Sequence, residues 1–472
     1  MSFAPQRRQP EELIDLSVSQ RCHVVGIGGP GMSPLAYLLS GQGHRMTGSD
    51  MHASDVTEYL QAEGINISIG HLPDLVHDVD VVTYSTAVPM SNVELQEAQK
   101  IGVPIRHRSG LLASLCAVRE SVGVAGTHGK TTTTALLTHI LVSAGLDPSC
   151  IVGGKVDSMP VGARHGDGDL LILECDESDG TLDVLPLSHL IITNIDVDHL
   201  DYFGSFEQVQ QTFVDAAMRT TGTIVLNADD ELSEPVRQKL SSELRVRTFG
   251  RTPGTEVQIM SVNHEESGIT VQMKFGTDMC VCHSPLRGEH NAMNLAGACA
   301  MACALGVSPQ DACDAAASFF GVERRFTERG EFNGALLVDD YAHLPAEIEA
   351  AIAAAQSHPR TTGKTFAVFQ PNRFHRIAAM ADTYADCFIA ADVVVITDVY
   401  ASGTAFIEGV TGELVVNAIR KAHPDAEVVW APTRDNIVEF VAANIAPGDI
   451  CISMGCGDIE TFPDDLVGRQ SS

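Results

Sequence analysis

Short, mostly apolar runs recur along the chain, and longer segments that mix apolar and polar residues separate them. A short apolar run bounded by turn residues is typical of a strand, and the mixed segments have helical spacing. Apolar strands that alternate with helices indicate a parallel sheet buried on both faces. In the first two hundred residues we predict strands at 22–27, 44–48, 80–85, 122–125, 170–173 and 190–193, with helices at 32–40 and 131–140.

The same alternation begins again after Gly321 and indicates a second α/β domain of Rossmann type. Its expected strands are 336–338, 366–369, 392–396, 428–430 and 450–453, and helices are expected between them, such as 346–356, 377–390 and 434–444. Between the two regions, residues 254–286 alternate strictly, which predicts a small antiparallel addition, and an Ala-rich helix is expected at 295–304. Cys280 and Cys282 share one face of this addition, so packing is a better interpretation than zinc binding.

Residues 122–134 carry the most specific chemical signal in this pattern. The strand breaks at Gly126, and a glycine-rich turn before a helix leaves backbone N–H groups where the helix dipole favours an anion. Lys130 adds a positive charge, and Thr131 offers a hydroxyl suited to Mg²⁺. Because Val124 stands where the common P-loop has its first glycine, this is a tighter variant of a phosphate cradle. A glycine-rich turn with an incidental lysine is the alternative.

Two further strands of this region end in polar residues, at Glu174 and at 194–199. Ligands of parallel sheets bind beyond the carboxyl ends of the strands, so Glu174, His199 and Lys130 are expected to converge. Glu174 is a hard oxygen ligand for a metal beside bound phosphate, although a solvated loop acid is the alternative. For His199, a capping or core histidine is the alternative, since Mg²⁺ prefers oxygen.

The first predicted strand runs into residues 26–31, which satisfy G-x-G-x-x-G. Asp50 ends the next strand, near the distance at which a dinucleotide-binding fold places its ribose-binding acid. This favours NAD(P) if it is read alone, but the same turn can hold any pyrophosphate. Farther along, Asn291 and Asn294 share one helical face that could hold an adenine edge, with helix capping as the alternative. The arginines that begin the helix after 369 would accept a carboxylate, or are ordinary surface residues.

Composition and charge mainly exclude functions. A chain of 472 residues predicts two to four domains. Its net charge of −31 argues against a nucleic-acid partner, because phosphate backbones require a basic footprint. No apolar run approaches the roughly 18 residues of a membrane span, and the N-terminus lacks the apolar core of a signal peptide, so we expect a cytoplasmic protein without membrane insertion. The 12 cysteines lack C-x-x-C pairs and are expected to be reduced.

Several blocks in a fixed order resemble the Mur ligase family and, within it, the branch that adds L-alanine. They are GIGGPGMSPLA (26–36), AGTHGKTTTT (125–134), ECDESD (174–179), TNIDVDHLDYFG (193–204), GEHNAMNLAGA (288–298), RRF (324–326), VDDYAHLPAEI (338–348), FQPNRF (369–374) and MGCGDI (454–459). The resemblance covers nearly the full length. It implies ligation driven by MgATP, in which the lactyl carboxylate of UDP-N-acetylmuramate becomes an acyl phosphate and the amine of L-alanine displaces phosphate.

The resemblance also implies three α/β domains: a Rossmann-like UDP-sugar domain at 1–118, a central P-loop ATPase-like domain with a mixed sheet at 119–320, and a Rossmann-like amino-acid domain at 321–472. It implies ATP contacts at Gly126, Thr127, His128, Gly129, Lys130, Thr131, Thr132, Asn291, Asn294, Arg325 and Asp340, and Mg²⁺ ligands at Thr131, Glu174 and His199. It implies UDP-sugar contacts at Gly28, Gly29, Gly31, Met32, Ser33, Asp50, His71, Ser85, Thr86, His107 and Arg108. The implied amino-acid contacts are Tyr341, His343, Arg373 and Arg376, and the implied catalytic residues are Lys130, Glu174, His199, Arg325 and His343.

Two positions depart from the family pattern. Leu344 stands where the family usually has a second histidine, and Asn372 stands where it usually has another. Both face the implied amino-acid side, so they bear on the identity of the amino acid more than on the reaction. We find no good candidate for the carbamylated lysine of other branches, which favours alanine. We expect a monomer or homodimer, and we expect Lys130→Ala to abolish ligation while the fold stays intact.

Three alternative functions remain open at this point. A recycling ligase would add a preformed peptide to the same sugar nucleotide. A dehydrogenase that binds NAD(P) would explain residues 26–31 and Asp50 but would leave the Lys130 cradle unexplained. A nucleotide sensor with inactive chemistry is a third class, and the intact Lys130, Glu174 and His199 argue against it.

Overall fold

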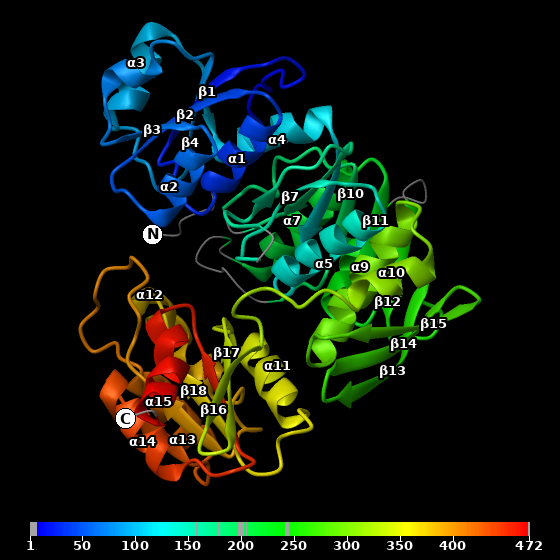
Figure 1. Cartoon of the computed structure of the whole chain (residues 1–472), viewed down its shortest axis with the longest axis vertical. Helices are drawn as coiled ribbons and strands as arrows, with labels where there is room; N and C mark the ends of the chain where they lie inside the picture. Colours follow the sequence, from blue (N-terminus) through cyan, green and yellow to red (C-terminus); the bar gives the residue numbers. More distant parts are fainter. Residues whose placement is uncertain are drawn as a thin grey trace. The chain divides into compact units, whose positions relative to one another are not determined.

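The computed structural model describes residues 7–156, 159–177, 179–196, 203, 205–240 and 245–470. Within these residues, three sheets of five, ten and six strands organise the fold (Figure 1). The chain divides into two compact units, of which the first comprises residues 1–260, 272–282 and 293–322, and the second comprises 261–271, 283–292 and 323–472. The first sheet therefore lies in the first unit, the second lies mostly in the first unit, and the third lies in the second unit.

The N-terminal sheet is parallel and has the order β3-β2-β1-β4-β5. Its strands are β1 (Arg21–Val25), β2 (Arg45–Asp50), β3 (Asn66–Ile69), β4 (Val81–Tyr84) and β5 (Ile105–His107), and its helices are α1 (Ser33–Gly41), α2 (Asp55–Ala62), α3 (Val93–Ile101) and α4 (Arg108–Val118). This is the doubly wound order, in which the connections reverse direction between β1 and β4. Ligands of such sheets bind at that reversal, where the turn after β1 lies.

The central sheet has the order β15-β14-β13-β12-β11-β10-β6-β9-β7-β8. Its strands are β6 (Glu120–Ala125), β7 (Ser149–Ile151), β8 (Ala163–Arg164), β9 (Leu170–Glu174), β10 (His189–Ile192), β11 (Thr223–Asn227), β12 (Arg245–Gly250), β13 (Val257–Glu265), β14 (Gly268–Phe275) and β15 (Asp278–Ser284). Its helices are α5 (Lys130–Ser143), α7 (Phe206–Arg219), α8 (Glu234–Lys239), α9 (Glu289–Ala304) and α10 (Pro309–Ala316). Strand β6 lies between β10 and β9 and is parallel to both, so their carboxyl ends meet at one edge.

The alternating region at 254–286 forms β13, β14 and β15, as predicted. Turns of two residues join these strands, which only antiparallel neighbours allow. The addition is not separate, however, because β13 pairs with β12 in parallel and so continues the central sheet. Cys280 and Cys282 are both buried on one face of β15, and none of the twelve cysteines, all of which are described residues, forms a disulfide.

The C-terminal sheet has the order β16-β17-β21-β18-β19-β20, with β16 antiparallel to β17 and the others parallel. Its strands are β16 (Thr327–Phe332), β17 (Ala335–Asp340), β18 (Thr365–Phe369), β19 (Val393–Ile396), β20 (Val428–Trp430) and β21 (Ile450–Met454). Its helices are α11 (Pro345–Gln356), α12 (Phe374–Met380), α13 (Glu413–Ala422), α14 (Arg434–Asn444) and α15 (Phe462–Gln470). Short 3₁₀ helices occur in all three regions: η1 (Pro73–Val76), η2 (Glu231–Ser233), η3 (Ala381–Tyr384) and η4 (Asp458–Thr461).

Two features of the C-terminal region differ from the sequence analysis. The helix predicted at 377–390 is wrong: α12 begins at Phe374 and ends at Met380, and only the short η3 follows. Tertiary contact overrides the helical pattern here, because Tyr384 is fully buried and its hydroxyl donates to the backbone carbonyl of His343 at 2.9 Å. Strand β16 was not predicted, because its sequence TERGEF is largely polar and lies at a sheet edge.

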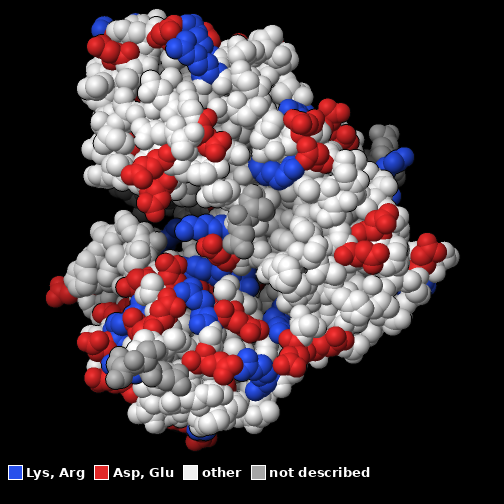
Figure 2. All heavy atoms as spheres, viewed as in Figure 1, with Lys and Arg blue, Asp and Glu red and all other residues white. Residues whose placement is uncertain are grey.

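Lys and Arg side chains lie interspersed with Asp and Glu on the face shown in Figure 2. Among the described residues, no helix combines the length and the apolar character that crossing a membrane requires. The cores of the sheets consist of the predicted apolar runs; strand β9, for example, buries Leu170, Leu171, Ile172 and Leu173 in succession. The polar residues that follow such strands are therefore held at the sheet edges, where a site can form.

Candidate active site

The turn between β6 and α5 requires its two glycines. Gly126 has φ +134° and Gly129 has φ +80°, a region that side chains rarely adopt. A Cβ atom on Gly126 would lie 2.1 Å from the hydroxyl of Thr193, and one on Gly129 would lie 2.3 Å from the Oδ1 atom of Asn294. Helix α5 begins directly after Gly129, so its first N–H groups face the turn, as an anion site requires.

The ammonium group of Lys130 is held inside this turn by a carboxylate that the sequence analysis missed. Nζ lies 3.0 Å and 3.2 Å from the two carboxylate oxygens of Glu177, and it donates to the carbonyls of Gly126 at 2.5 Å and Thr127 at 3.2 Å. Burial lowers the pKa of Lys130, but the neighbouring carboxylates, Glu177 first, outweigh burial and raise it. Lys130 therefore stays charged inside the turn, while its predicted contact with phosphate stays a prediction.

Glu174 lies beside the first turn of α5, as predicted. The hydroxyl of Thr131 donates to its Oε1 atom at 3.0 Å, and the N–H of Gly153 donates to its Oε2 atom at 2.7 Å. A hydroxyl and a carboxylate fit Mg²⁺, which usually takes one or two protein oxygens and completes its shell with phosphate and water. Among the described residues, no three His, Cys, Asp or Glu side chains form a metal cluster by themselves. The predicted third ligand, His199, lies outside the described residues.

The end of β10 holds the other side of the turn. The N–H of His128 donates to Oδ1 of Asn194 at 2.9 Å, and the amide nitrogen of Asn194 donates back to the His128 carbonyl at 2.9 Å. The His128 ring lies 3.3 Å from the carboxylate of Asp196, and the N–H of Asp196 donates to the Thr127 hydroxyl at 2.8 Å. Residues 193–196 are thus brought to the cradle, as expected for adjacent parallel strands.

The two asparagines of the predicted adenine side lie in the first turns of α9, and both are buried. The side-chain amide of Asn291 donates to the backbone carbonyl of Arg287 at 2.8 Å, so at least part of its role is to hold the start of this helix. Asn294 stands against Gly129 of the turn. Thr132, also assigned to ATP, is buried in α5.

The glycine turn after β1 is closed by Asp50. One carboxylate oxygen of Asp50 accepts from the N–H of Gly28 at 2.9 Å and the other from the N–H of His52 at 3.2 Å. A Cβ atom on Gly31 would lie 3.0 Å from the guanidinium of Arg108, so this cation covers the turn. The Ser33 hydroxyl donates to the carbonyl of Gly29 at 3.1 Å. Met32 and Ser33 are both buried.

Arg108 links this turn to the acidic loop after β9. Its Nη2 atom contacts the carboxylate of Asp179 and donates to the hydroxyl of Thr181 at 3.2 Å. His107 caps the same helix by accepting from the N–H of Ser109, and burial lowers the pKa of His107 to about 4. The Ser85-Thr86 turn follows β4, where the Ser85 carbonyl accepts from the N–H of Val88 at 3.0 Å. The sequence did not indicate the contact between Arg108 and Asp179.

In the second unit, Asp340 ends β17 and holds the backbone around it. Its two oxygens accept from the N–H groups of Phe326 and Ala342, each at 2.7 Å. Burial raises the pKa of Asp340 to about 6, and Arg325 opposes that shift. Because Phe326 has φ +53°, the carboxylate supports a strained turn. The structure thus shows a structural role for Asp340, while its predicted contact with ATP stays a prediction.

Tyr341, His343 and Arg325 come together beside Glu347. The guanidinium carbon of Arg325 lies 5.4 Å from the centre of the Tyr341 ring, and its Nη1 atom lies 3.7 Å from the Glu347 carboxylate. Nδ1 of His343 lies 3.2 Å from the same carboxylate and 3.1 Å from the Tyr341 carbonyl. Burial lowers the pKa of His343 and Glu347 opposes it, so the ring is neutral at pH 7. These predicted residues therefore form one cluster.

The chain is similar to known proteins over nearly its full length. Three family models match successive parts of the chain: the Mur ligase family catalytic domain at 21–120, the Mur ligase middle domain at 124–302, and the Mur ligase glutamate ligase domain at 324–457. A curated UDP-N-acetylmuramate–L-alanine ligase from Brucella anthropi is 38% identical over 93% of this chain and 94% of its own. The chain belongs to the Mur ligase family.

Solved structures support the membership. A UDP-N-acetylmuramate–alanine ligase from Thermotoga maritima is 26% identical, covers 96% of this chain and 99% of its own, and has a TM-score of 0.76. A murein peptide ligase from Psychrobacter arcticus, 23% identical over 95% of this chain and 98% of its own with a TM-score of 0.66, shares the fold. The three-domain α/β architecture predicted from the sequence is confirmed, and the chain is a ligase that forms an amide bond. Members of this family use ATP, which disfavours the dehydrogenase reading.

The positions where this Mur ligase departs from the family pattern are both buried. Leu344 lies at the start of α11. The Asn372 amide nitrogen donates to Sγ of Cys456 at 2.7 Å, and its oxygen accepts from Arg376 at 3.2 Å. Arg376 is thereby fixed in the first turn of α12, while Arg373 precedes that helix with φ +59°. At this position, Asn372 thus provides an amide in place of the histidine ring that the family usually has, and its oxygen accepts a hydrogen bond from Arg376.

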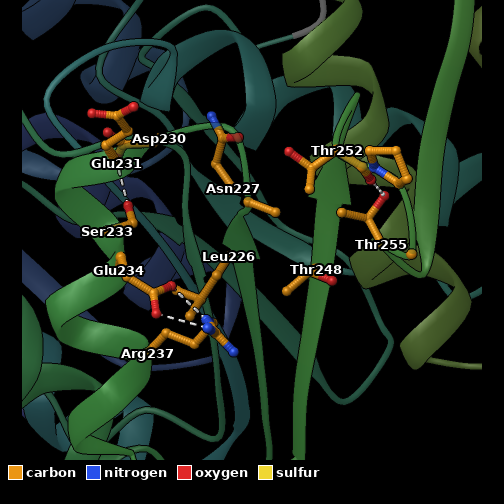
Figure 3. Close-up of a pocket in the computed structure, with 13 residues that line it drawn as sticks. Leu226, Asn227, Asp230, Glu231, Ser233, Glu234, Arg237, Thr248, Thr252 and Thr255 are labelled. Atoms are coloured by element: carbon orange, nitrogen blue, oxygen red, sulfur yellow. Dashed lines mark hydrogen bonds and ion pairs between the residues drawn. The ribbon is translucent and has the colours of Figure 1, made fainter.

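A cavity of about 470 Å³ lies elsewhere in this Mur ligase, at the carboxyl ends of β11 and β12 (Figure 3). Its charged and hydroxyl groups contact one another: Arg237 pairs with Glu234 at 2.6 Å, and the Thr255 hydroxyl donates to the Thr252 carbonyl at 3.0 Å. Its lining residues do not include Lys130, Thr131 or Glu174. The phosphate cradle, and not this cavity, is therefore the candidate active site.

Proposed function

We propose that this chain joins L-alanine to the lactyl carboxylate of UDP-N-acetylmuramate, at the expense of ATP and through an acyl phosphate, in the first peptide step of peptidoglycan synthesis. The 38% identical relative that bears this name supports the choice of substrates. Support for the chemistry comes from Lys130, whose ammonium is buried, charged and aimed into a turn that leaves helix N–H groups for phosphate. A carboxylate is a poor acyl donor, and phosphorylation provides the leaving group.

The proposed roles follow the contacts within each unit. Lys130 and the first turn of α5 hold the phosphates, and Thr131 and Glu174 hold Mg²⁺, which supplies charge for the phosphoryl group when it is bound. His199 is proposed as a further ligand. The protein contributes mainly position and charge, since this reaction needs no covalent step on the chain.

The turn at 26–31, with Arg108 over it, is proposed to bind the pyrophosphate of the UDP-sugar. In the second unit, the carbonyl of Tyr341 can only accept, so Nδ1 of His343 carries the hydrogen and Nε2 presents a lone pair. We assign this lone pair to the alanine ammonium, and the buried Arg376 to its carboxylate. Arg325 is proposed to contact ATP or the acyl phosphate.

We also propose the domain boundaries 1–118, 119–320 and 321–472, a cytoplasmic location, and a monomer or homodimer. The first boundary falls at the end of α4 and the third domain begins before β16, so neither boundary cuts a sheet.

The decisive experiment measures ADP release with MgATP, UDP-N-acetylmuramate and each amino acid in turn. We expect release with L-alanine to exceed release with any other amino acid, and to require the sugar nucleotide. Release that is faster with a preformed peptide than with L-alanine would establish the recycling ligase instead. Absence of release with every acceptor, in a protein that still binds ATP, would favour the nucleotide sensor.

A further inference from the structure

Glu94 is a fully buried carboxylate in α3 that none of the proposed steps uses. Its Oε2 atom accepts from the Ser49 hydroxyl at 2.6 Å and lies 3.3 Å from Nε2 of His23. Its Oε1 atom accepts from the N–H of Leu72 at 3.0 Å and lies 3.5 Å from Nδ1 of His71. A buried carboxylate with this many donors is held in one orientation.

These contacts fix the direction of each hydrogen bond. An ionised carboxylate only accepts, so the single hydrogen of the Ser49 hydroxyl is directed at Glu94. The Ser49 oxygen, 2.9 Å from Nδ1 of His71, can then only accept from that nitrogen. Burial raises the pKa of Glu94, but hydrogen bonds from His23 and Ser49 outweigh it and lower the pKa, so the carboxylate is ionised. In a neutral His71, Nδ1 therefore carries the hydrogen and Nε2 presents a lone pair.

His71 lies at the ligand edge of the N-terminal sheet. It follows β3, and Ser49 precedes Asp50, whose carboxylate closes the glycine turn. The His71 side chain is 15% exposed, whereas Glu94 is completely buried, so the ring connects the core to the edge where ligands of parallel sheets bind. A base bound at this edge would meet the ring.

We propose that Glu94, acting through Ser49, is a positioning residue that makes Nε2 of His71 a hydrogen-bond acceptor, so that the site selects a base that donates there. Uracil carries a hydrogen on N3 and satisfies this requirement. Cytosine presents a lone pair at N3, so its N3 and the Nε2 atom of His71 would face each other as two acceptors without a hydrogen between them. Such mispairing costs about tenfold or more in affinity. This inference rests on the proposed UDP-sugar site and adds the origin of its preference for uracil.

Glu94→Gln tests the direction of the hydrogen bonds with a minimal change of shape. The N–H of Leu72 still needs an acceptor, which places the amide oxygen at the Oε1 position and the NH₂ group against Ser49. The amide then donates to the Ser49 oxygen, whose hydrogen turns toward Nδ1 of His71, and Nε2 becomes a donor. A second variant, His71→Leu, removes the ring at a partly exposed position and leaves the buried carboxylate in place.

The measurement is the ratio of dissociation constants of CDP and UDP, obtained by calorimetric titration of the same protein sample. The parent is expected to favour UDP by about tenfold or more, and both variants are expected to lower this preference about tenfold. Partial unfolding of a sample would lower its apparent affinity for UDP and for CDP by the same factor, so it would leave the ratio of the two dissociation constants unchanged. Glu97→Gln, in the same helix at the ion pair with Lys100, is the matched control and should keep the parental ratio.

The proposal is overturned if Glu94→Gln keeps a ratio within about twofold of the parent, whatever His71→Leu does. It is also overturned if the parent binds UDP-N-acetylmuramate but does not distinguish UDP from CDP, and in that case the proposed function stands. If the parent does not bind UDP-N-acetylmuramate, the proposed function itself fails, and this inference fails with it.

Discussion

Lys130→Ala should destabilise the fold as well as stop the reaction, which reverses the expectation from the sequence that this change would leave the fold intact. The Lys130 side chain is only 14% exposed, and Glu177, with which it pairs, is 2% exposed. Breaking a buried ion pair by removing one partner costs about 3–5 kcal/mol, because a charge stays buried without its counterion. For a domain of this size, such a loss lowers the melting temperature by roughly 10 °C.

Thermal unfolding without nucleotide, followed by calorimetry, measures this loss. The double variant Lys130→Ala/Glu177→Gln removes both charges and should recover about half or more of the lost stability, although it remains inactive. Lys100→Ala is the matched control, because that lysine is 73% exposed in an ion pair on α3 and its loss should leave the melting temperature nearly unchanged. If Lys130→Ala melts within about 2 °C of the parent, or if the double variant recovers nothing, the pair with Glu177 does not carry the stability assigned to it.

Two further predictions concern the metal and pH. Glu174→Gln should raise the Mg²⁺ concentration needed for half-maximal phosphate release by about tenfold or more, because the amide is a weaker ligand; an unchanged Mg²⁺ dependence would exclude Glu174 as a ligand. The pKa of His107 falls from an ordinary 6.5 to about 4 in the folded state, so the unfolded state binds more protons between these two pH values. The contribution of His107 to the free energy of unfolding is therefore fully present above about pH 6.5 and is lost as the pH falls toward about 4. His107→Asn keeps a capping side chain that does not titrate, and it should reduce the acid destabilisation by up to about 3 kcal/mol, measured by denaturant unfolding at pH 4.5 and 7. An equal loss of unfolding free energy between these pH values in the parent and the variant would contradict this prediction.

The sequence by itself determined the strands that consist of pronounced apolar runs, and it determined the cradle. Consecutive apolar residues such as those in β9 are stable only when both faces of the strand are buried, so an apolar run in the sequence predicts a strand inside a covered sheet. The turn at 126–131 is local as well, because glycines with positive φ, a lysine and a helix start follow one another directly. Parallel strands bring their carboxyl ends to one edge, which is why the meeting of Glu174 with Thr131 could be predicted.

Only the tertiary structure decided which partners these residues have. Glu177 lies 47 positions from Lys130, and Asp179 lies 71 positions from Arg108, and no local pattern distinguishes these carboxylates from their acidic neighbours. The helix predicted at 377–390 ended early because the burial of Tyr384 outweighed local propensity, and β16 formed from a polar sequence because β17 offered it a free edge. In each case long-range packing selected one of several locally acceptable states. Propensity differences of a few tenths of a kcal/mol per residue cannot compete with the burial of a side chain or a charge.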